Sequence, residues 1–201
     1  MVDVQISRPS TQPGLSAVAQ VLDDVFGMVA PATMFRVGFM NDLVRSDQLI
    51  LLAGSAEEPL GALVALRGRN HIEMPDMVVA AEHQGGGIGR RLFEAMTRWA
   101  VDEGFREIRW SVSPSNVNGV AAYLAYGARI VGWIDNAYGV ASDPFYTGTT
   151  DRFRGEWRAD ERPPIVETKL VHHEDHAQLR SLLLSGWQIT RRQGDLYAVV
   201  R

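Results

Sequence analysis

A cluster of glycines between two apolar segments limits how this chain can fold more than any other feature. Gly85-Gly86-Gly87, flanked by Gln84 and by Ile88-Gly89-Arg90, follows the apolar run Met77-Val78-Val79-Ala80 and opens an amphipathic segment. The pattern predicts a strand, a glycine loop and a helix in succession. At a helix N-terminus the first backbone N–H groups lack intrahelical acceptors, and the helix dipole favours negative charge. The loop is therefore predicted to bind a phosphate group.

The residues around these glycines exclude two familiar phosphate loops. A Walker-type loop ends in Gly-Lys-Ser or Gly-Lys-Thr, which bring an amine and a hydroxyl to phosphate and magnesium, whereas Gly89 is followed by Arg90 and Arg91. A dinucleotide fingerprint that starts at Gly85 or Gly87 needs its third glycine at position 90 or 92, and those positions hold arginine and leucine. Taken alone, the cluster also fits a tight turn between strand and helix that binds nothing.

A third pattern, Gln/Arg-x-x-Gly-x-Gly/Ala, is present in full. Gln84, Gly87 and Gly89 supply it, and here the chain resembles the GNAT superfamily of acyl-CoA-dependent N-acyltransferases. In that family the amides of this loop hold the pyrophosphate of coenzyme A. The resemblance therefore implies that residues 84–90 bind acetyl-CoA or another acyl-CoA, with Arg90 adding a charge-assisted contact.

A second segment resembles the same family further along the chain. After the strand-like run 107–112, Asn116 opens a short apolar segment, Tyr123 lies seven residues later, and Gly127 closes it. This order and spacing resemble the second GNAT signature. Ala128 departs from it, because the family usually has an aromatic residue there. Two signatures in the family's order are far more specific than either one alone.

The resemblance also implies roles in the reaction. The backbone of Met77, Val78 and Val79 is expected to pair with the pantetheine arm, and one of its amides is expected to face the thioester oxygen. Tyr123 is the expected general acid, since a phenol with a pKa of about 10 is protonated at neutral pH and can protonate the leaving thiolate. Asn116 is expected to bind the pantetheine or to position the loop. The alternatives are a core tyrosine and a helix N-cap.

A general base is harder to assign. Glu73, our candidate, and Asp76 precede the cofactor strand, where either carboxylate could relay a proton through water, and His71 and His83 titrate in the useful range. All four residues are also typical of solvated strand ends. The amine can lose its proton to solvent as well, so the reaction does not require a dedicated base.

Charge and cysteine content exclude several other function classes. A net charge of −4 disfavours general binding to nucleic acid or to an anionic membrane. The absence of cysteine excludes disulfides, a thiol nucleophile and thiolate zinc sites. No signal-peptide pattern lies in residues 1–11, and no apolar run approaches the length of about 20 residues that a membrane helix needs. We therefore expect a cytoplasmic protein with neither nucleic-acid nor membrane partners.

The segment 172–176, with three histidines, a glutamate and an aspartate, superficially resembles a metal site. Adjacent side chains on one short segment cannot all converge on one ion. The segment fits the start of a solvated helix better, and we expect no metal in the reaction.

Hydrophobic periodicity predicts an α+β fold. The expected strands are 2–8, 48–53, 60–66, 72–79, 107–112 and 128–133, and the expected helices are 15–25, 31–43, 88–104 and 118–126. Pro75 predicts an interrupted ladder in the fourth strand, and Pro13 and Gly14 are expected to precede the first helix. This order is also that of the GNAT fold, a mixed and mostly antiparallel central sheet flanked by helices.

The chain continues well beyond a minimal domain of this type. We predict a GNAT-like acyltransferase domain over 1–160 and a strand-helix-strand extension over 161–201, separated by the break Arg162-Pro163-Pro164. The extension is expected to pack on the first domain or on a partner subunit, which would make a homodimer. The runs 148–157 and 186–197 are similar to a GNAT subgroup linked to amino-acid N-succinylation, although the region 112–118 departs from that subgroup.

The function that the resemblance implies is N-acyl transfer. An acetyl or other short acyl group would pass from acyl-CoA to a primary amine of a small molecule. Two alternatives stay open. One is an acyl-CoA-binding regulatory or degenerate module without catalysis, in which Tyr123 is structural, and the other is an N-acetyltransferase that acts on proteins.

Overall fold

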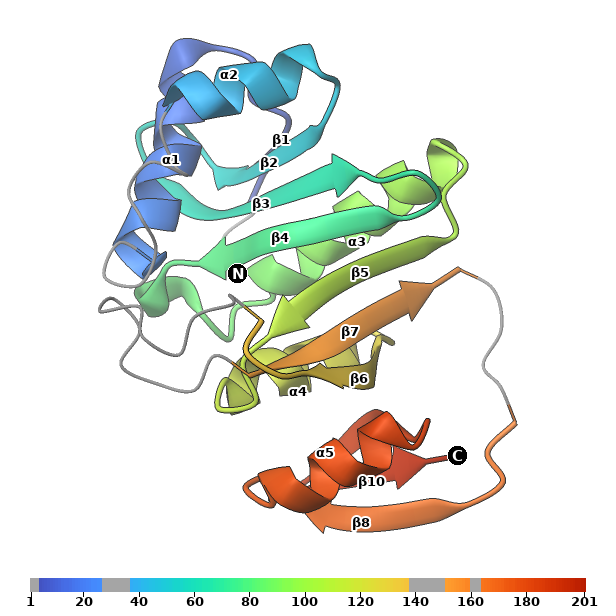
Figure 1. Cartoon of the computed structure of the whole chain (residues 1–201). Coiled ribbons are helices and arrows are strands. Elements are labelled where there is room, and N and C mark those ends of the chain that lie inside the picture. Colours follow the sequence, from blue (N-terminus) through green and yellow to red (C-terminus); the bar gives the residue numbers. More distant parts are fainter. Residues whose placement is uncertain (1–3, 27–36, 138–150, 160–163) are drawn as a thin grey trace. The chain divides into compact units, whose positions relative to one another are not determined.

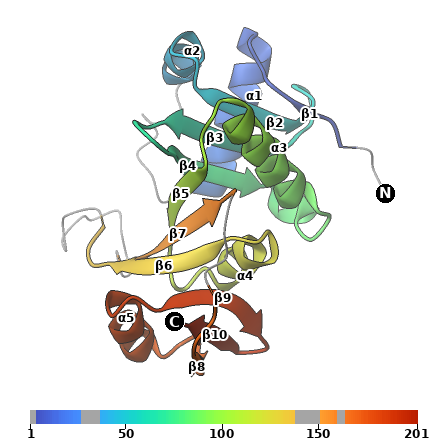
Figure 2. The ribbon, with the colours of Figure 1, turned by 90° about the vertical axis from the view of Figure 1, so that its right-hand side faces the viewer.

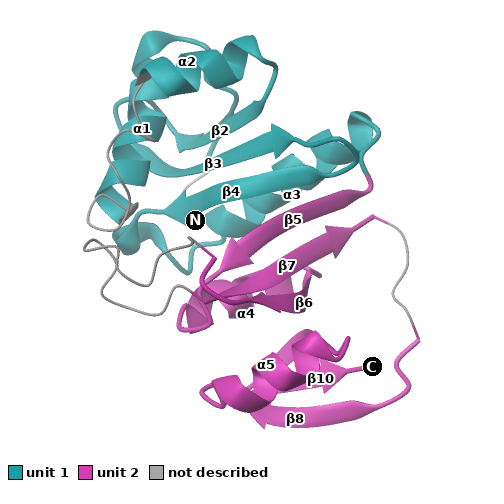
Figure 3. Cartoon of the chain, in the orientation of Figure 1, with its two compact units in different colours: residues 1–105 teal, residues 106–201 magenta. Residues whose placement is uncertain are grey.

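The computed structural model describes residues 4–26, 37–137, 151–159 and 164–201. The chain forms two compact units, residues 1–105 and 106–201, which Figure 3 colours separately. Each unit contains strands and helices of its own.

The described residues of the first unit combine four strands with three α-helices. In chain order these are β1 (Ile6–Ser7), α1 (Gln12–Phe26), α2 (Val37–Arg45), β2 (Leu49–Gly54), β3 (Pro59–Arg67), β4 (Ile72–Val79), the 3-10 helix η1 (Ala81–His83) and α3 (Ile88–Asp102). The strands follow one another in the order β1-β2-β3-β4, and their pairings are antiparallel. They run from blue to green in Figure 1.

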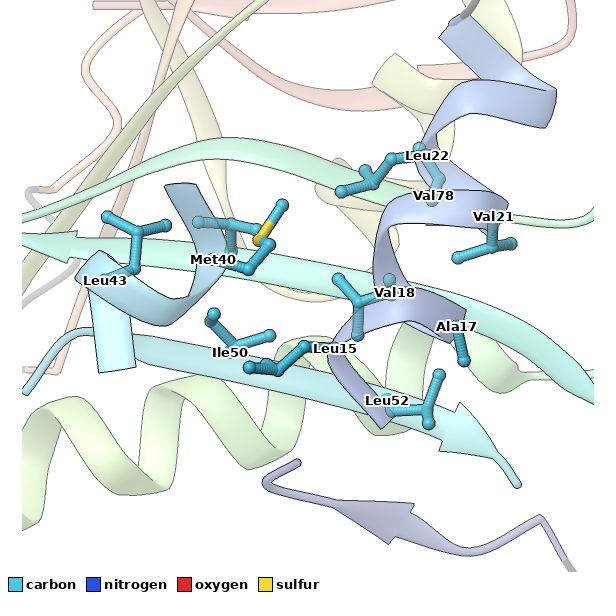
Figure 4. Packing of buried hydrophobic residues seen from close by; sticks show 12 residues of the cluster. Leu15, Ala17, Val18, Val21, Leu22, Met40, Leu43, Ile50, Leu52 and Val78 are labelled. Atoms are coloured by element: carbon cyan, nitrogen blue, oxygen red, sulfur yellow. The ribbon is translucent and has the colours of Figure 1, made fainter. Parts of the chain in front are cut away.

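An apolar stripe of α1 forms the centre of one buried cluster in this unit. Leu15, Val18 and Leu22 have no exposed surface, and their spacing of three and four residues places them on one helix face. They share the cluster with residues of α2, β2, β3 and β4 (Figure 4). Burial of this stripe, rather than helix propensity, holds α1 in place.

Helix α3 packs on β3 and β4 through its own apolar stripe. Ile88 and Leu92 of this stripe are buried. A Cβ atom at Gly61 of β3 would lie 3.4 Å from side-chain atoms of both residues. The same Cβ atom would lie only 2.8 Å from the carbonyl oxygen of Val78 on β4, so the close pairing of β3 with β4 at this point favours glycine.

The interruption expected at Pro75 is present. Val64 of β3 pairs with Asp76, but Leu66 pairs with Glu73, so the register shifts by one residue. One residue of β3 then faces two residues of β4, the geometry of a β-bulge. Proline lacks an N–H to donate to the ladder, so the pairing breaks where proline lies.

The expectation that Pro13 and Gly14 precede the first helix is wrong. Both residues lie inside α1, in its first turn. Proline is tolerated there because its missing N–H would have no helical acceptor anyway. The N-terminal part of the second expected helix, residues 31–36, lies outside the described residues, and α2 covers the remainder.

The second unit has six described strands and two helices. In chain order these are β5 (Glu107–Val112), α4 (Val117–Ala125), β6 (Arg129–Ile134), β7 (Arg152–Arg158), β8 (Thr168–His172), α5 (His176–Leu184), β9 (Gln188–Gln193) and β10 (Leu196–Val200). The strand order within the unit is β5-β7-β6-β9-β10-β8. Figure 2 shows β8 at the outer end of this series.

Strand β7 was not expected from the sequence. Its residues Arg-Phe-Arg-Gly-Glu-Trp-Arg are mostly charged, which disguises a period-two alternation with Phe153 and Gly155 buried. The strand pairs with β5 and with β6 and so separates them. This placement makes β7 the central link of the β5-β7-β6 group.

The α+β fold class is confirmed. Helices accompany a mostly antiparallel arrangement of strands. The extension contains the expected strand and helix, β8 and α5, and the expected last strand is a hairpin of two strands, β9 and β10. The boundary between the compact units falls after Phe105. The partition into an acyltransferase domain over 1–160 and an extension over 161–201 stays a prediction.

We expect Gly155→Ala to destabilise the protein. A Cβ atom at this position of β7 would overlap the indole of Trp110 on β5, and neither a buried ring nor a central strand can move away cheaply. The expected loss is about 2–4 kcal/mol in the free energy of unfolding, measured by urea titration.

Gly38→Ala in α2 is the matched control, because a Cβ atom there has nothing within 4 Å and alanine suits a helix better than glycine. Its stability should equal or slightly exceed that of the wild type. A wild-type urea midpoint for Gly155→Ala would show that Trp110 does not pack over β7 in this way.

Candidate functional site

The predicted cofactor strand is the C-terminal half of β4. Met77 pairs with Leu63, and Val79 with Gly61, so this half forms a regular antiparallel ladder with β3 after the bulge. Val78 is buried, whereas Met77 and Val79 are only partly buried. The ladder therefore fixes the position of the β4 backbone just before the glycine loop.

Two hydrogen bonds tie the start of the loop to the sheet. The N–H of Ala80 donates to the carbonyl of Leu60 at 3.0 Å. The side-chain amide of Gln84 donates to the carbonyl of Val79 at 3.1 Å. Between them, η1 makes one short turn. Gln84 thus has an observable structural role, which is to fold the loop back on the end of β4.

The three glycines of the loop are not equivalent. Gly85 and Gly87 have φ angles of 78° and 83°, in the left-handed region that other residues avoid. Gly86 is not among the glycines with positive φ, and a Cβ atom there would meet only the carbonyl oxygen of His83 at an ordinary 3.5 Å. Chain conformation thus explains glycine at 85 and 87 but not at 86.

Helix α3 begins without a capping side chain. Its N-cap is Gly87, which has no side chain to accept a bond from the first turn. Gln84 to Gly87 are exposed, Ile88 is buried and Gly89 is partly buried. The exposed loop and the positive end of the helix dipole together favour an anion at this point.

Arg90 extends from the first turn of α3 into solvent. Its Nε lies 2.8 Å from Oε1 of Glu94, and its side chain is 65% exposed. An exposed pair one helical turn apart is worth only a few tenths of a kcal/mol. The Glu94 pair by itself therefore opposes a phosphate contact of the guanidinium group only weakly.

Two carboxylates lie on β4 in different environments. Glu73 is about half exposed and lies 2.7 Å from Nε2 of His71. Asp76 is mostly buried, and this burial raises the pKa of its carboxyl to about 6. It is paired with Val64, and Val64 and Val78 both belong to the apolar cluster under α1. Desolvation by this cluster is the physical cause of the shift.

Asn116 and Tyr123 lie at the start and in the last turn of α4. The side-chain oxygen of Asn116 accepts a bond from the N–H of Gly119 at 2.9 Å, so it is the N-cap of the helix. The helix ends at Gly127, whose φ is 85°, and the N–H of Ala128 donates to the carbonyl of Tyr123 at 3.1 Å. Ala128 is buried, so a small residue fills the place of the family's aromatic one.

The ring of Tyr123 rests on a neighbouring aromatic side chain. It is 9% exposed, and its centroid lies 4.8 Å from that of Trp110 on β5, with the ring planes tilted by 42°. Trp110 in turn lies over Gly155 of β7. Trp110 therefore supports the ring of Tyr123, and glycine at 155 leaves room for the indole. Neither residue is predicted from the sequence to have this role. The alternation of aromatic and charged residues on both strands is the signal that could have identified them.

The predicted site residues thus form two groups. One comprises β4, the glycine loop and the start of α3 in the first unit, and the other comprises Asn116 and Tyr123 in the second. Within each group the residues lie on one continuous stretch of backbone. Their roles in binding and catalysis stay predictions.

A cavity of about 600 Å³ lies in the second unit. It is lined by the C-terminal end of α4 and by three arginines, Arg129, Arg158 and Arg191. Glu156 lies 2.6 Å from Arg158 and 3.6 Å from Arg129, so a carboxylate already compensates two of these charges. None of the predicted site residues lines this cavity.

Neither a metal site nor a membrane-spanning helix is found among the described residues. No group of three or more histidine and acidic side chains is arranged to hold a metal ion. The helices that the structure describes are too short or too polar to cross a membrane.

Comparison with known proteins identifies the family. The model of the acetyltransferase (GNAT) family matches residues 15–128, more than half of the chain. Rat N-acetyltransferase 8B is 26% identical over 87 residues, which are 40% of this chain and 39% of that protein. The chain therefore matches well under half the length of this relative.

Solved structures share the fold at low identity. A GNAT family acetyltransferase from Elizabethkingia anophelis with acetyl-CoA bound is 18% identical, with a TM-score of 0.61 over 79% of this chain and 99% of that chain. A ribosomal-protein-alanine N-acetyltransferase from Brucella melitensis is 17% identical, with a TM-score of 0.63 over 77% of this chain and 99% of that chain. The match over residues 15–128 agrees with the two sequence signatures and with the α+β architecture. The chain therefore belongs to the GNAT acetyltransferase family.

Proposed function

We propose that this protein transfers an acetyl or other short acyl group from acyl-CoA to a primary amine of a small molecule. The observation that carries the proposal is the uncapped N-terminus of α3, which follows an exposed loop of three glycines at the end of β4. We propose the cytoplasm as its compartment, in keeping with the absence of cysteine.

The glycine loop would hold the diphosphate of coenzyme A. The amides of residues 85–89 supply donors, the helix dipole supplies positive potential, and Arg90 supplies a full charge at the rim. The glycine at 86, which the chain conformation does not require, leaves room for a diphosphate oxygen to approach the backbone. The acetyl-CoA bound to the relative from Elizabethkingia anophelis supports the choice of ligand.

The reaction needs one proton removed and one supplied. The amine nitrogen attacks the thioester carbonyl carbon, the carbon–sulfur bond breaks, and the products are an amide and the free thiol of coenzyme A. An amide of β4 within residues 77–79 would polarise the carbonyl oxygen. The phenol of Tyr123 would donate its proton to the departing thiolate. Stacking on Trp110 restricts the ring and so favours one direction of proton transfer.

A carboxylate on β4 would accept the proton of the ammonium group through water. Glu73 is the candidate that the sequence suggests, and Asp76 on the same strand fits the role better. A carboxyl with a pKa of about 6 is mostly ionised at neutral pH and is a stronger base than an exposed one. Asp76 lies one residue before the proposed cofactor strand.

Two rival functions make different predictions. A degenerate acyl-CoA-binding module would bind the thioester but release no thiol in the presence of amines. A protein N-acetyltransferase, the activity named for the relative from Brucella melitensis, would label polypeptides. The long segment after Asp151 favours a small amine, since extra chain is available to close a peptide groove.

Thiol release tests the main proposal. Purified protein is incubated with acetyl-CoA or succinyl-CoA and a panel of primary amines, and free thiol is measured. We expect amine-dependent release with at least one donor. If no thiol is released, calorimetry with coenzyme A distinguishes two cases. Binding of coenzyme A without thiol release indicates the degenerate module. No binding of coenzyme A contradicts the proposal. Labelled acyl-CoA added to a lysate would show whether proteins or metabolites carry the label.

Gly86→Ala tests whether the loop contacts a ligand. Because neither φ nor packing requires glycine at this position, we expect an unchanged melting temperature but about tenfold weaker binding of coenzyme A in calorimetry. Gly38→Ala is the control and should change neither quantity noticeably. Wild-type affinity in Gly86→Ala would place the diphosphate away from this residue.

Tyr123→Phe tests the acid. Loss of the phenolic proton should lower kcat by about 100-fold while changing the affinity for coenzyme A by less than about twofold. Tyr126→Phe is a matched control, because Tyr126 ends the same helix and its ring centroid lies 6.5 Å from that of Tyr123. Equal loss of activity in both variants, or in neither, would contradict the assignment.

Asp76→Asn tests the base by its pH dependence. Because the native carboxyl has a pKa of about 6 and the unfolded one 3.8, the native state binds more protons between these values, and stability falls as pH rises through this window. Asp76→Asn has no titrating carboxyl at this position, so it lacks this loss of stability with rising pH. We expect it to be more stable than the wild type by roughly 1–2 kcal/mol at pH 8, after allowance for partial exposure, with the difference vanishing by pH 4.

The same variant should lose activity. Wild-type kcat/KM is expected to rise with pH through about 6, the pKa of Asp76, and Asp76→Asn should lack this limb. Glu73→Gln is the matched control, and its half-exposed side chain predicts a change in stability of less than about 0.5 kcal/mol. A larger loss of activity in Glu73→Gln than in Asp76→Asn would make Glu73 the base.

A further inference from the structure

Strand β8 is the outermost strand of the second unit. It pairs with β10 on one side, and it ends the strand order of the unit. Figure 1 shows it in orange, with the described chain on one side of it only. An outermost strand presents a row of backbone donors and acceptors that can pair with another chain.

The hydrogen bonds to β10 establish which residues face outward. Glu167 and Arg201 exchange both backbone bonds, at 3.1 and 3.2 Å, and His173 donates to Asp195 at 2.9 Å. In an antiparallel ladder such bonded positions alternate. Glu167, Lys169, Val171 and His173 therefore point their backbone groups at β10. Thr168, Leu170 and His172 point theirs at the outer edge.

The outer edge is also unusually apolar. Of the six large hydrophobic side chains that are exposed among the described residues, one lies in β8, Leu170 at 53% exposure, and two lie just before it, Ile165 at 61% and Val166 at 85%. Natural edge strands are normally protected by charges, bulges or proline. In β8 the one charged residue, Lys169, lies with its Nζ 4.3 Å from the ring centroid of Trp187 and 3.8 Å from Oε1 of Glu167. This exposed contact leaves Glu167 and Lys169 able to exchange partners with a second copy at little cost. The edge is therefore suited to pairing.

The sequence of the edge is complementary to itself in a single antiparallel register. Two copies related by a two-fold axis at Thr168 would place Glu167 opposite Lys169 and Val166 opposite Leu170. The outward-facing Thr168 would then pair with its own copy. An axis at residue 167 or 169 would instead oppose two glutamates or two lysines. An axis at Leu170 would place Lys169 opposite Val171, so the lysine would have no oppositely charged residue across from it.

We propose that β8 pairs with β8 of a second copy of this chain, antiparallel and centred on Thr168, to form a symmetric dimer. The interface combines the two backbone bonds that Thr168 exchanges with its own copy, an apolar stripe of Val166 and Leu170 from both copies, and two Glu167–Lys169 pairs. The N–H of Val166 donates to the carbonyl of Arg201 at 2.8 Å and takes no part in the pairing. Because the outer edge involves none of the residues assigned to acyl transfer, the proposal is independent of the proposed function.

The oligomeric state of the full chain tests the pairing. Light scattering should give about twice the chain mass of 22.2 kDa at high protein concentration. Leu170→Lys should reduce the mass to that of a monomer. Leu184→Lys, at a similarly exposed leucine on α5 (58%), should not. Circular dichroism checks that each variant is folded.

Charge exchange tests the register. Glu167→Lys would oppose two lysines and should weaken dimerisation at least tenfold. The double variant Glu167→Lys with Lys169→Glu restores opposite charges within each chain, where the two side chains lie 3.8 Å apart in the wild type, and also across an axis at Thr168. It should therefore recover most of the lost affinity. Failure of the double variant to recover would exclude this register.

The absence of cysteine makes cross-linking specific. Directly opposed, hydrogen-bonded residues of antiparallel strands have Cα atoms about 5.5 Å apart, within the range that a disulfide spans. Thr168→Cys should therefore give covalent dimers on mild oxidation, and Leu184→Cys should not. A wild-type monomer at all concentrations, or equal cross-linking of the two variants, would overturn the proposal.

Discussion

The unsatisfied donors at the start of α3 are the constraint on which the rest of the candidate site depends. A helix that begins at glycine has no side chain to cap its first turn, so its N–H groups must bind water or a ligand. The preceding strand, the glycines with positive φ and the buried Ile88 hold that turn at the end of β4. Backbone groups thus form the main part of the candidate site, and side chains add to it.

Elements with a strong local signal were predictable. The glycine loop, the bulge at Pro75 and the strand 72–79 follow from backbone chemistry that a few residues determine. Strand β7 was missed because its charged residues hide the alternation, and only its pairing with β5 and β6 makes it a strand. The position of Pro13 inside α1 was missed because proline both breaks and begins helices.

The candidate site was predictable at the level of motifs but not of environments. Sequence spacing named Tyr123, yet only the structure reveals that Trp110 supports its ring. Likewise Glu73 and Asp76 look equivalent in sequence. Their difference arises from partners far along the chain, since Asp76 pairs with Val64 beside the α1 cluster and Glu73 reaches solvent. Such long-range neighbours cannot be derived from local pattern.

The packing of Trp110 over Gly155 has an evolutionary consequence. As long as the indole occupies the space above position 155, selection must retain glycine there, although β7 would gain stability from a side chain with higher strand propensity. The two positions should therefore vary together across relatives. A lineage that replaces the tryptophan with a small residue would be free to fill position 155, and it would need another support for the ring of Tyr123.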